Sequence, residues 1–152
     1  MIKYNIVCVG NLKDKFFIDA QNEFVKRLSA FSTVNIIEVA EKTKEDNIDI
    51  TLEKEAQLLE KHLAGYVVLL DIGGKEMSSE HFAVYLKTLE LEESVITFVI
   101  GGSYGVHQRI KDVANARLSF SKMTFPHRLA RIMLLEQLYR ANMISANRSY
   151  HK

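Results

Sequence analysis

The apolar residues of this 152-residue chain follow two different periodicities. Five short runs are almost continuously apolar and rich in β-branched residues, a pattern typical of strands buried on both faces of a parallel sheet. The runs cover residues 2–9, 33–39, 66–70, 95–100 and 118–120. Elsewhere apolar residues recur every three or four positions, which predicts amphipathic helices. The predicted helices cover residues 14–28, 52–62, a segment from 78 or 79 to 89, 107–114, and a last segment from 126 or 127 to 144.

Strands that alternate with helices predict an α/β fold, with a mostly parallel sheet and helices on both of its faces. Thr51 is the predicted N-cap of the second helix, and Ser78 or Ser79 is that of the third. Between the regular elements, residues 41–49 have the composition of a charged loop and residues 71–75 that of a glycine turn.

Length and composition exclude several classes of protein. The chain is long enough for one domain, residues 1–152. It contains no apolar run of the length that a transmembrane helix needs, and its first residues have the pattern of a strand rather than of a signal peptide. The single cysteine, Cys8, cannot form an internal disulfide. We therefore expect a cytoplasmic protein without a membrane partner.

The charge is divided unevenly along the chain. Residues 1–100 hold 11 lysine and arginine residues against 17 aspartate and glutamate residues, a balance of −6. Residues 101–152 hold 9 against 2, a balance of +7. Such a division suggests an anionic partner, with nucleic acid as the first candidate. Docking of the basic half on the acidic half, or on another subunit, explains the charge equally well.

Two neighbouring stretches in the basic half have the composition of a ligand site. Gly101, Gly102 and Gly105 follow a buried strand, and glycine lets the backbone approach a ligand closely. Their spacing is that of neither the dinucleotide fingerprint nor the P-loop, so a plain structural turn remains an alternative. The second stretch interleaves apolar and polar residues that suit a flat heterocycle. It consists of Phe120, Ser121, Lys122, Met123, Thr124 and Phe125, and core packing with a helix cap from Thr124 is its alternative interpretation.

The last helix and the tail carry the remaining candidates. His127 is either a base or an ordinary first-turn residue, and no histidine or cysteine lies near it at the spacing of metal ligands. The helix is apolar around most of its circumference, which suggests a subunit interface. Arg148, Tyr150 and His151 suit phosphate contact and base stacking, although a frayed terminus has the same composition.

Six segments together resemble the ribosomal RNA large-subunit pseudouridine N3-methyltransferases of the SPOUT class. The similarity covers essentially the whole chain, and its most specific block runs from Leu118 to Arg140. Asn147 and Ser149 depart from the pattern, which has a glycine and a proline there. The matching segments are Cys8-Val9-Gly10-Asn11-Leu12-Lys13, Leu70-Asp71-Ile72-Gly73-Gly74-Lys75 with Ser78-Ser79-Glu80, Phe98-Val99-Ile100-Gly101-Gly102-Ser103-Tyr104-Gly105, Leu118-Ser119-Phe120-Ser121-Lys122-Met123-Thr124-Phe125-Pro126-His127, Glu136-Gln137-Leu138-Tyr139-Arg140-Ala141 and Tyr150-His151-Lys152.

The resemblance implies a C-terminal trefoil knot, which is an exception to the rule that chains do not thread loops. It also implies a homodimer in which each active site borrows from the second subunit, and an S-adenosylmethionine site made by the knot, with no metal. The residues expected at that site are Leu70, Gly101, Gly102, Gly105, Phe120, Ser121, Lys122, Met123, Thr124 and Phe125.

The implied reaction is methyl transfer to N3 of a pseudouridine in large-subunit ribosomal RNA, with the assembled ribosome as partner. Arg140 is a candidate for stabilising the developing anion or holding a phosphate, and either His127 or His151 for taking the proton. The residues expected to touch RNA are Arg128, Arg131, Arg148, Tyr150 and His151. The residues alone also admit a ribosome-binding protein that is no enzyme, or an ordinary dinucleotide-binding enzyme.

Overall fold

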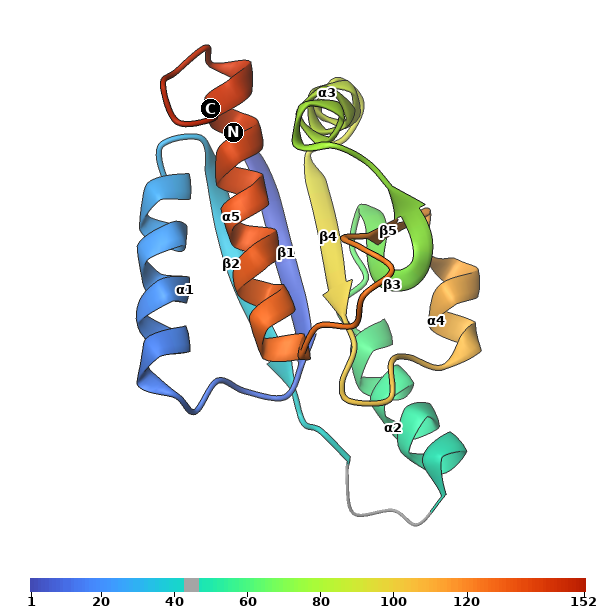
Figure 1. The fold of residues 1–152 in the computed structure, drawn as a ribbon. Helices are drawn as coiled ribbons and strands as arrows, with labels where there is room; N and C mark the ends of the chain where they lie inside the picture. Colours follow the sequence, from blue (N-terminus) through green and yellow to red (C-terminus); the bar gives the residue numbers. More distant parts are fainter. Residues whose placement is uncertain (43–46) are drawn as a thin grey trace.

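The structure is a computed structural model that describes residues 1–42 and 47–152. Its centre is a five-stranded sheet in the order β2-β1-β4-β3-β5, and every pairing between neighbouring strands is parallel (Figure 1). This confirms the predicted α/β class. The strands are β1 (Ile2–Val9), β2 (Ser32–Val39), β3 (Tyr66–Glu76), β4 (Val95–Ile100) and β5 (Ala116–Ser119).

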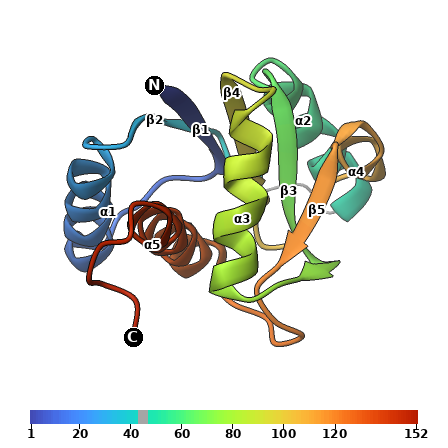
Figure 2. The same cartoon turned by 90° about the horizontal axis from the view of Figure 1, so that it is seen from above.

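Helices cover both faces of the sheet, as predicted, and each face has its own apolar core (Figure 2). On one face, α5 (His127–Ser145) lies between α1 (Lys15–Leu28) and α3 (Ser79–Glu90) and buries Leu134, Leu135 and Leu138. On the other face, α2 (Ile48–Glu60) and α4 (Gln108–Val113) cover Val7, Val9 and Val99. No helix in the described part of the chain is long and apolar enough to cross a membrane.

The start of the second helix was predicted wrongly. Its N-cap is Asn47, whose side chain accepts a hydrogen bond from the Asp49 amide at 2.8 Å, and Thr51 is a buried residue of the helix. The error has a physical source, because Ile48 and Ile50 are about half exposed and hide the amphipathic pattern of the first turn. Residues 43–46 of the loop predicted at 41–49 lie outside the described residues, and residues 48 and 49 belong to the helix.

The third strand also differs from its prediction, because it does not end at Leu70. Leu70 and Lys75 both pair with Leu118, so the residues between them leave the ladder as a bulge before the strand resumes. At Gly74 a Cβ would lie 2.7 Å from the Arg117 carbonyl carbon, and only glycine permits this approach. The bulge places residues 71 and 72 beside the end of β4, where the ligand cavity lies.

The connection from β5 to α5 positions the site. Because β5 lies at the edge of the sheet and α5 packs over its centre, residues 120–126 must cross the carboxyl ends of β3 and β4 (Figure 1). The glycine turn follows β4 directly at this same end. In parallel α/β proteins, ligands bind at the carboxyl ends of the strands.

Candidate functional site

The glycine turn after β4 is tight and well supported. The Gly105 amide donates to the Gly102 carbonyl at 3.1 Å, and Gly105 has a φ of +79°, which favours glycine. At Gly101 a Cβ would lie 2.6 Å from the Gly105 carbonyl oxygen, so the turn closes only without a side chain there. The following helix, α4, is anchored to α2 because Arg109 pairs with both Glu53 and Glu60.

A cavity of about 860 Å³ lies between this turn, the bulge of β3 and the crossing segment. The volume falls within the usual range for small-molecule sites. Of the ten residues expected to contact S-adenosylmethionine, nine line the cavity, and Lys122 is exposed beside it. The structure thus brings together residues that lie up to 55 positions apart in the sequence, from Leu70 to Phe125.

Short-range hydrogen bonds shape the crossing segment. Ser119 donates to the Ser121 carbonyl at 2.9 Å, and the Ser121 hydroxyl accepts from the Met123 amide at 2.9 Å. The N-cap of α5 is Pro126, and no side chain caps this end, so Thr124 does not have the capping role that was the alternative interpretation. The polar residues of the segment therefore fold the loop itself.

His127, the first residue of α5, is a half-buried histidine at the edge of the cavity. Its Nε2 is shielded from solvent and has no hydrogen-bond partner among the described residues. It lies 3.6 Å from the point where a Cβ on Gly10 would stand. Burial lowers the pKa of His127, the neighbouring Arg128 and Arg131 lower it further, and Glu41 acts in the opposite direction. The net effect favours the neutral imidazole of His127.

Two arginines one turn apart in α5 have different environments. Arg128 lines the cavity, keeps 30% of its side chain exposed and donates from Nε to the Asn11 carbonyl at 2.8 Å. Arg131 is 1% exposed and links α5 to three other elements. Its guanidinium donates to Glu38 at 2.7 Å, to Gln21 at 3.1 Å and to the Gly10 carbonyl at 3.2 Å. We therefore reassign Arg131 from the expected RNA contact to a structural role.

A second polar cluster, the tail cluster, lies at the other end of α5 and consists of Glu136, Arg140, Tyr150, His151 and Glu80. Arg140 donates from Nε to Glu136 at 2.9 Å, and its guanidinium lies 4.9 Å from the centre of the Tyr150 ring. The Glu136 carboxylate raises the pKa of Arg140. The Tyr150 hydroxyl also donates to Glu136, at 3.2 Å. The tail is thus packed on its own helix and is not a frayed end.

The chain enters the tail cluster through a left-handed residue. Asn147 has a φ of +54°, and the Arg148 amide donates to the Met143 carbonyl at 2.9 Å, an arrangement that commonly closes helices. Asparagine tolerates this conformation better than other non-glycine residues. This explains how Asn147 substitutes for the glycine of the family pattern. Arg148 then lies over the ring of Phe31 at 5.2 Å and stays exposed.

The hydrogen bonds of His151 determine its tautomer. Arg140 Nη1 lies 3.0 Å from His151 Nδ1, and a guanidinium only donates, so Nδ1 is the acceptor. The proton is then on Nε2, which lies 2.6 Å from a carboxylate oxygen of Glu80. This hydrogen bond lowers the pKa of Glu80. Arg140 thus occupies the nitrogen with which His151 would accept a proton.

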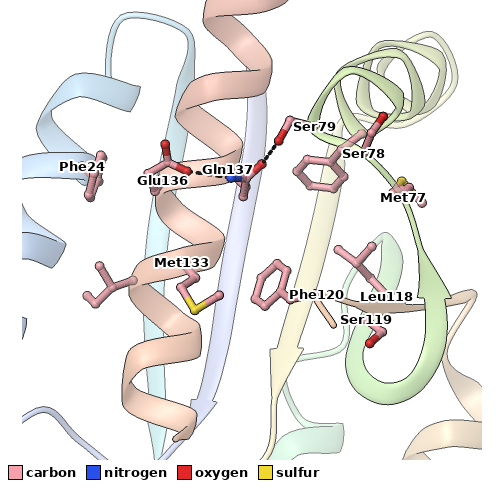
Figure 3. Close-up of a pocket in the computed structure, with 12 residues that line it drawn as sticks. Phe24, Met77, Ser78, Ser79, Leu118, Ser119, Phe120, Met133, Glu136 and Gln137 are labelled. Atoms are coloured by element: carbon pink, nitrogen blue, oxygen red, sulfur yellow. Dashed lines mark hydrogen bonds between the residues drawn. The ribbon is translucent and has the colours of Figure 1, made fainter. Parts of the chain in front are cut away.

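A groove connects the two ends of α5 on the side that faces α3 (Figure 3). It has a volume of about 390 Å³ and shares Leu118, Ser119 and Phe120 with the cavity. Met133 and Phe120 face one another across it, and Ser79 donates to Gln137 at 2.7 Å further along (Figure 3). The groove is more apolar than the tail cluster beyond it, so it separates two polar regions.

The structure does not bring together His127 and His151, the two candidates for taking the proton. His127 and Arg140 are 13 positions apart on one helix, which places them about 20 Å apart at 1.5 Å per residue. His151 lies with Arg140. The described residues contain no group of three or more histidine, cysteine, aspartate or glutamate side chains placed to hold a metal ion.

Sequence reasoning missed the polar partners that surround these candidates. Glu41 accepts from the Ser103 hydroxyl at 3.2 Å and so supports the glycine turn from outside. Nothing in the charged stretch around Glu41 distinguishes it from a solvated residue. Glu80 lay within a matching segment, but its contact with His151 joins positions 71 apart. Only the arrangement of α3 beside α5 reveals that contact.

Comparison with known proteins agrees with this architecture. Residues 2–151 match the family model described as a predicted SPOUT methyltransferase. A protein of Fusobacterium nucleatum named ribosomal RNA large subunit methyltransferase H is 46% identical, over 97% of this chain and 98% of its own length. A protein of the same name from Clostridium botulinum is also 46% identical with the same coverage.

A solved structure of a "probable methylase family protein" from Haemophilus influenzae Rd KW20 shares the fold. It superposes with a TM-score of 0.57 at 12% identity, over 98% of this chain and 70% of its own. The family match carries with it the implied trefoil knot. By the extent of the family match and of these identities, the chain belongs to the SPOUT methyltransferase family.

Proposed function

We propose that this chain transfers a methyl group from S-adenosylmethionine to N3 of a pseudouridine in large-subunit ribosomal RNA, and that it acts on the ribosome in the cytoplasm as a homodimer. The observation that carries the proposal is the cavity, which nine of the ten expected donor-binding residues line. Relatives with the name ribosomal RNA large subunit methyltransferase H support the nucleic-acid substrate.

The cavity fits S-adenosylmethionine in shape and chemistry. Leu70, Phe120 and Phe125 supply apolar surface for an adenine ring, and the glycine turn supplies backbone groups for its polar edge. Gly101 and Gly102 line the cavity with backbone atoms alone. S-adenosylmethionine, when bound here, supplies an electrophilic methyl group on a sulfonium. The chain therefore has to position the acceptor and manage one proton.

The tail cluster has the groups that this proton transfer requires. N3 of the uracil ring would lose its proton and bond to the methyl carbon as the carbon–sulfur bond of the donor breaks and leaves a neutral thioether, and negative charge would develop on the ring before the methyl arrives. Arg140 supplies fixed positive charge and two donors for a uracil carbonyl. When those donors turn to the substrate, Nδ1 of His151 is released and accepts the N3 proton. His127 is unsuitable as the acceptor of the N3 proton, because its Nε2 is shielded from solvent.

Within one chain, His127 at the edge of the cavity and Arg140 of the tail cluster lie about 20 Å apart along α5. A second subunit solves this problem if its tail cluster lies over the first subunit's cavity. The outward side of α5 supports such a dimer, because four of its large apolar side chains are only partly buried. They are Leu129, Ile132, Met133 and Met143.

Two measurements on the wild-type protein test this function. Calorimetric titration should give a saturable heat with S-adenosylmethionine, and ribosomes that lack the modification should take up one labelled methyl group per large subunit. A ribosome-binding protein that is not an enzyme would bind ribosomes and show no heat with S-adenosylmethionine. An ordinary dinucleotide site would instead give heat with a nicotinamide dinucleotide.

A further inference from the structure

Three large apolar side chains line the mouth of the cavity and remain open to solvent. Ile72 is 54% exposed, Tyr104 is 58% exposed and Met123 is 74% exposed. They come from the bulge of β3, the glycine turn and the crossing segment. A small molecule in such a cavity is normally enclosed over most of its surface, so side chains this exposed belong to the rim and not to the small-molecule site.

Tyr104 is the residue of this rim that is best held in place. It occupies the turn closed by the Gly105 amide and the Gly102 carbonyl, and its neighbour Ser103 is bonded to Glu41. No described residue bonds its hydroxyl or stacks on its ring. A Cβ at Gly105 would meet nothing within 4 Å, so there is open space beside Gly105, the residue that follows Tyr104. The ring is thus fixed at its base and free on its face.

The charges around the rim favour a polyanion. Lys111 and Arg128 line the same cavity, and Lys122 is exposed next to Met123. Of the carboxylates nearby, Asp71 pairs with Arg117 at 3.1 Å, and Glu41 accepts from Ser103 and lies 3.9 Å from Arg128, which leaves Lys111 and Lys122 as the cations without a carboxylate partner among the described residues. An exposed aromatic face among cations is the arrangement with which proteins hold unpaired nucleotides, since every base offers a face to stack on.

We infer that Tyr104 is a stacking platform for an unpaired nucleotide of the substrate RNA next to the target base. This inference rests on the proposed function. Met123 and Ile72 extend the apolar surface, and Lys111, Lys122 and Arg128 hold the adjoining phosphates. With the neighbouring nucleotide stacked on Tyr104, the target base is positioned at the mouth of the cavity and can enter it.

Kinetics of methyl transfer to ribosomes test the platform. Tyr104→Ala should raise KM for ribosomes about fivefold or more, the lower limit for losing one base stack, and leave kcat and the Kd for S-adenosylmethionine within twofold. Tyr104→Phe should behave as wild type, because the face is kept. Leu91→Ala, which removes a side chain that is 85% exposed far from the cavity, is the matched control.

A second measurement does not depend on catalysis. The chain has no tryptophan, so Tyr104→Trp introduces a single tryptophan at the rim, and the emission of this tryptophan should be quenched when ribosomes are added. Leu91→Trp should show no quenching. Unchanged KM in Tyr104→Ala together with unquenched emission would overturn the inference. So would a weakened Kd for S-adenosylmethionine, or loss of the dimer in sedimentation, in Tyr104→Ala. Failure of the wild type to methylate ribosomes would instead count against the proposed function.

Discussion

The two ends of α5 differ in almost every chemical property. At its first turns, Nε2 of His127 is shielded from solvent, and Arg131 is enclosed by partners on α1, β2 and the turn after β1. Around this end lie backbone-rich loops and a large cavity. At its last turns, Arg140, Tyr150 and His151 form a partly exposed polar cluster with two carboxylates. Under the proposed function, one end holds the methyl donor and the other carries the groups for proton transfer.

This division explains why the helix has apolar residues on more sides than its own sheet can cover. The buried side, with Leu134, Leu135 and Leu138, holds α5 on β1 and β4. The outward side stays partly exposed, with Met133 facing the groove. A second copy of the chain packed on that side would cover these side chains. It would also place the first turns of one α5 beside the last turns of the other. The predictions below separate the two ends by experiment.

The largest expected effect comes from the tail cluster. Arg140→Leu should lower kcat for methyl transfer about 100- to 1,000-fold, because a fixed donor for the developing charge is lost. The Kd for S-adenosylmethionine should not change. Arg148→Leu is the control, since Arg148 lies outside the cluster and should alter only KM for ribosomes. Equal kcat values for Arg140→Leu and wild type would remove Arg140 from the chemistry.

The cavity end should show the reverse pattern. In Gly101→Ala the new Cβ meets the Gly105 carbonyl at 2.6 Å, so the turn must open. The Kd for S-adenosylmethionine should rise about 10- to 100-fold, on the usual cost of overpacking a close contact. Gly73→Ala adds the same atom where only the Asp71 carboxylate lies at 4.0 Å, and calorimetry should find it unaffected. An unchanged Kd in Gly101→Ala would place the donor elsewhere.

A third comparison concerns the two arginines of the first turns. Arg131→Met should destabilise the fold by about 2–4 kcal/mol in urea denaturation, because Glu38 and the Gly10 carbonyl lose a buried partner. Arg128→Met should cost under about 1 kcal/mol, since Arg128 is partly solvated, and should instead raise KM for ribosomes. If the two variants were equally stable, the buried links of Arg131 would have no structural weight.

The smallest effect is the pH dependence due to His127. Its pKa is lowered by burial, so between that value and the ordinary histidine value of about 6.5 the unfolded chain binds more protons than the folded one. Stability from this source is complete above about pH 6.5 and is lost as the pH falls below it. His127→Gln should therefore make unfolding free energy between pH 7 and 5 less dependent on pH. A slope identical to that of wild type would contradict this.

Much of the fold could be predicted because its signals are local. Both bounds of β1 and β4 follow from continuous apolar runs, and the Ser78 cap of α3 is confirmed by its hydrogen bond from the His81 amide. The start of α2 was predicted wrongly because the half-exposed Ile48 and Ile50 hide the amphipathic pattern of its first turn. The bulge in β3 was not predicted, because a glycine that permits a close approach between strands looks the same in the sequence as a glycine in a turn.

The candidate site divides in the same way. The residues of the glycine turn and crossing segment could be named because they are contiguous in sequence. The role of Arg131 could not, because an arginine near a helix start has the same sequence signature whether it faces solvent or three buried partners. The separation of His127 from Arg140 depends only on helix length, whereas the pairing of Arg140 with His151 depends on a turn at Asn147.

The most direct test of a shared active site is complementation in a mixed dimer. One subunit carries Gly101→Ala and the other Arg140→Leu, with different affinity tags for purification of the mixed species. If each site joins the cavity of one chain with the tail cluster of the other, one of the two sites in the mixed dimer is intact. At an S-adenosylmethionine concentration near the wild-type Kd, where the Gly101→Ala cavity stays largely empty, methyl transfer to ribosomes should then recover to about half of the wild-type rate. Activity no higher than that of the two variant homodimers would contradict the account, because it would mean that both ends of α5 act within a single chain.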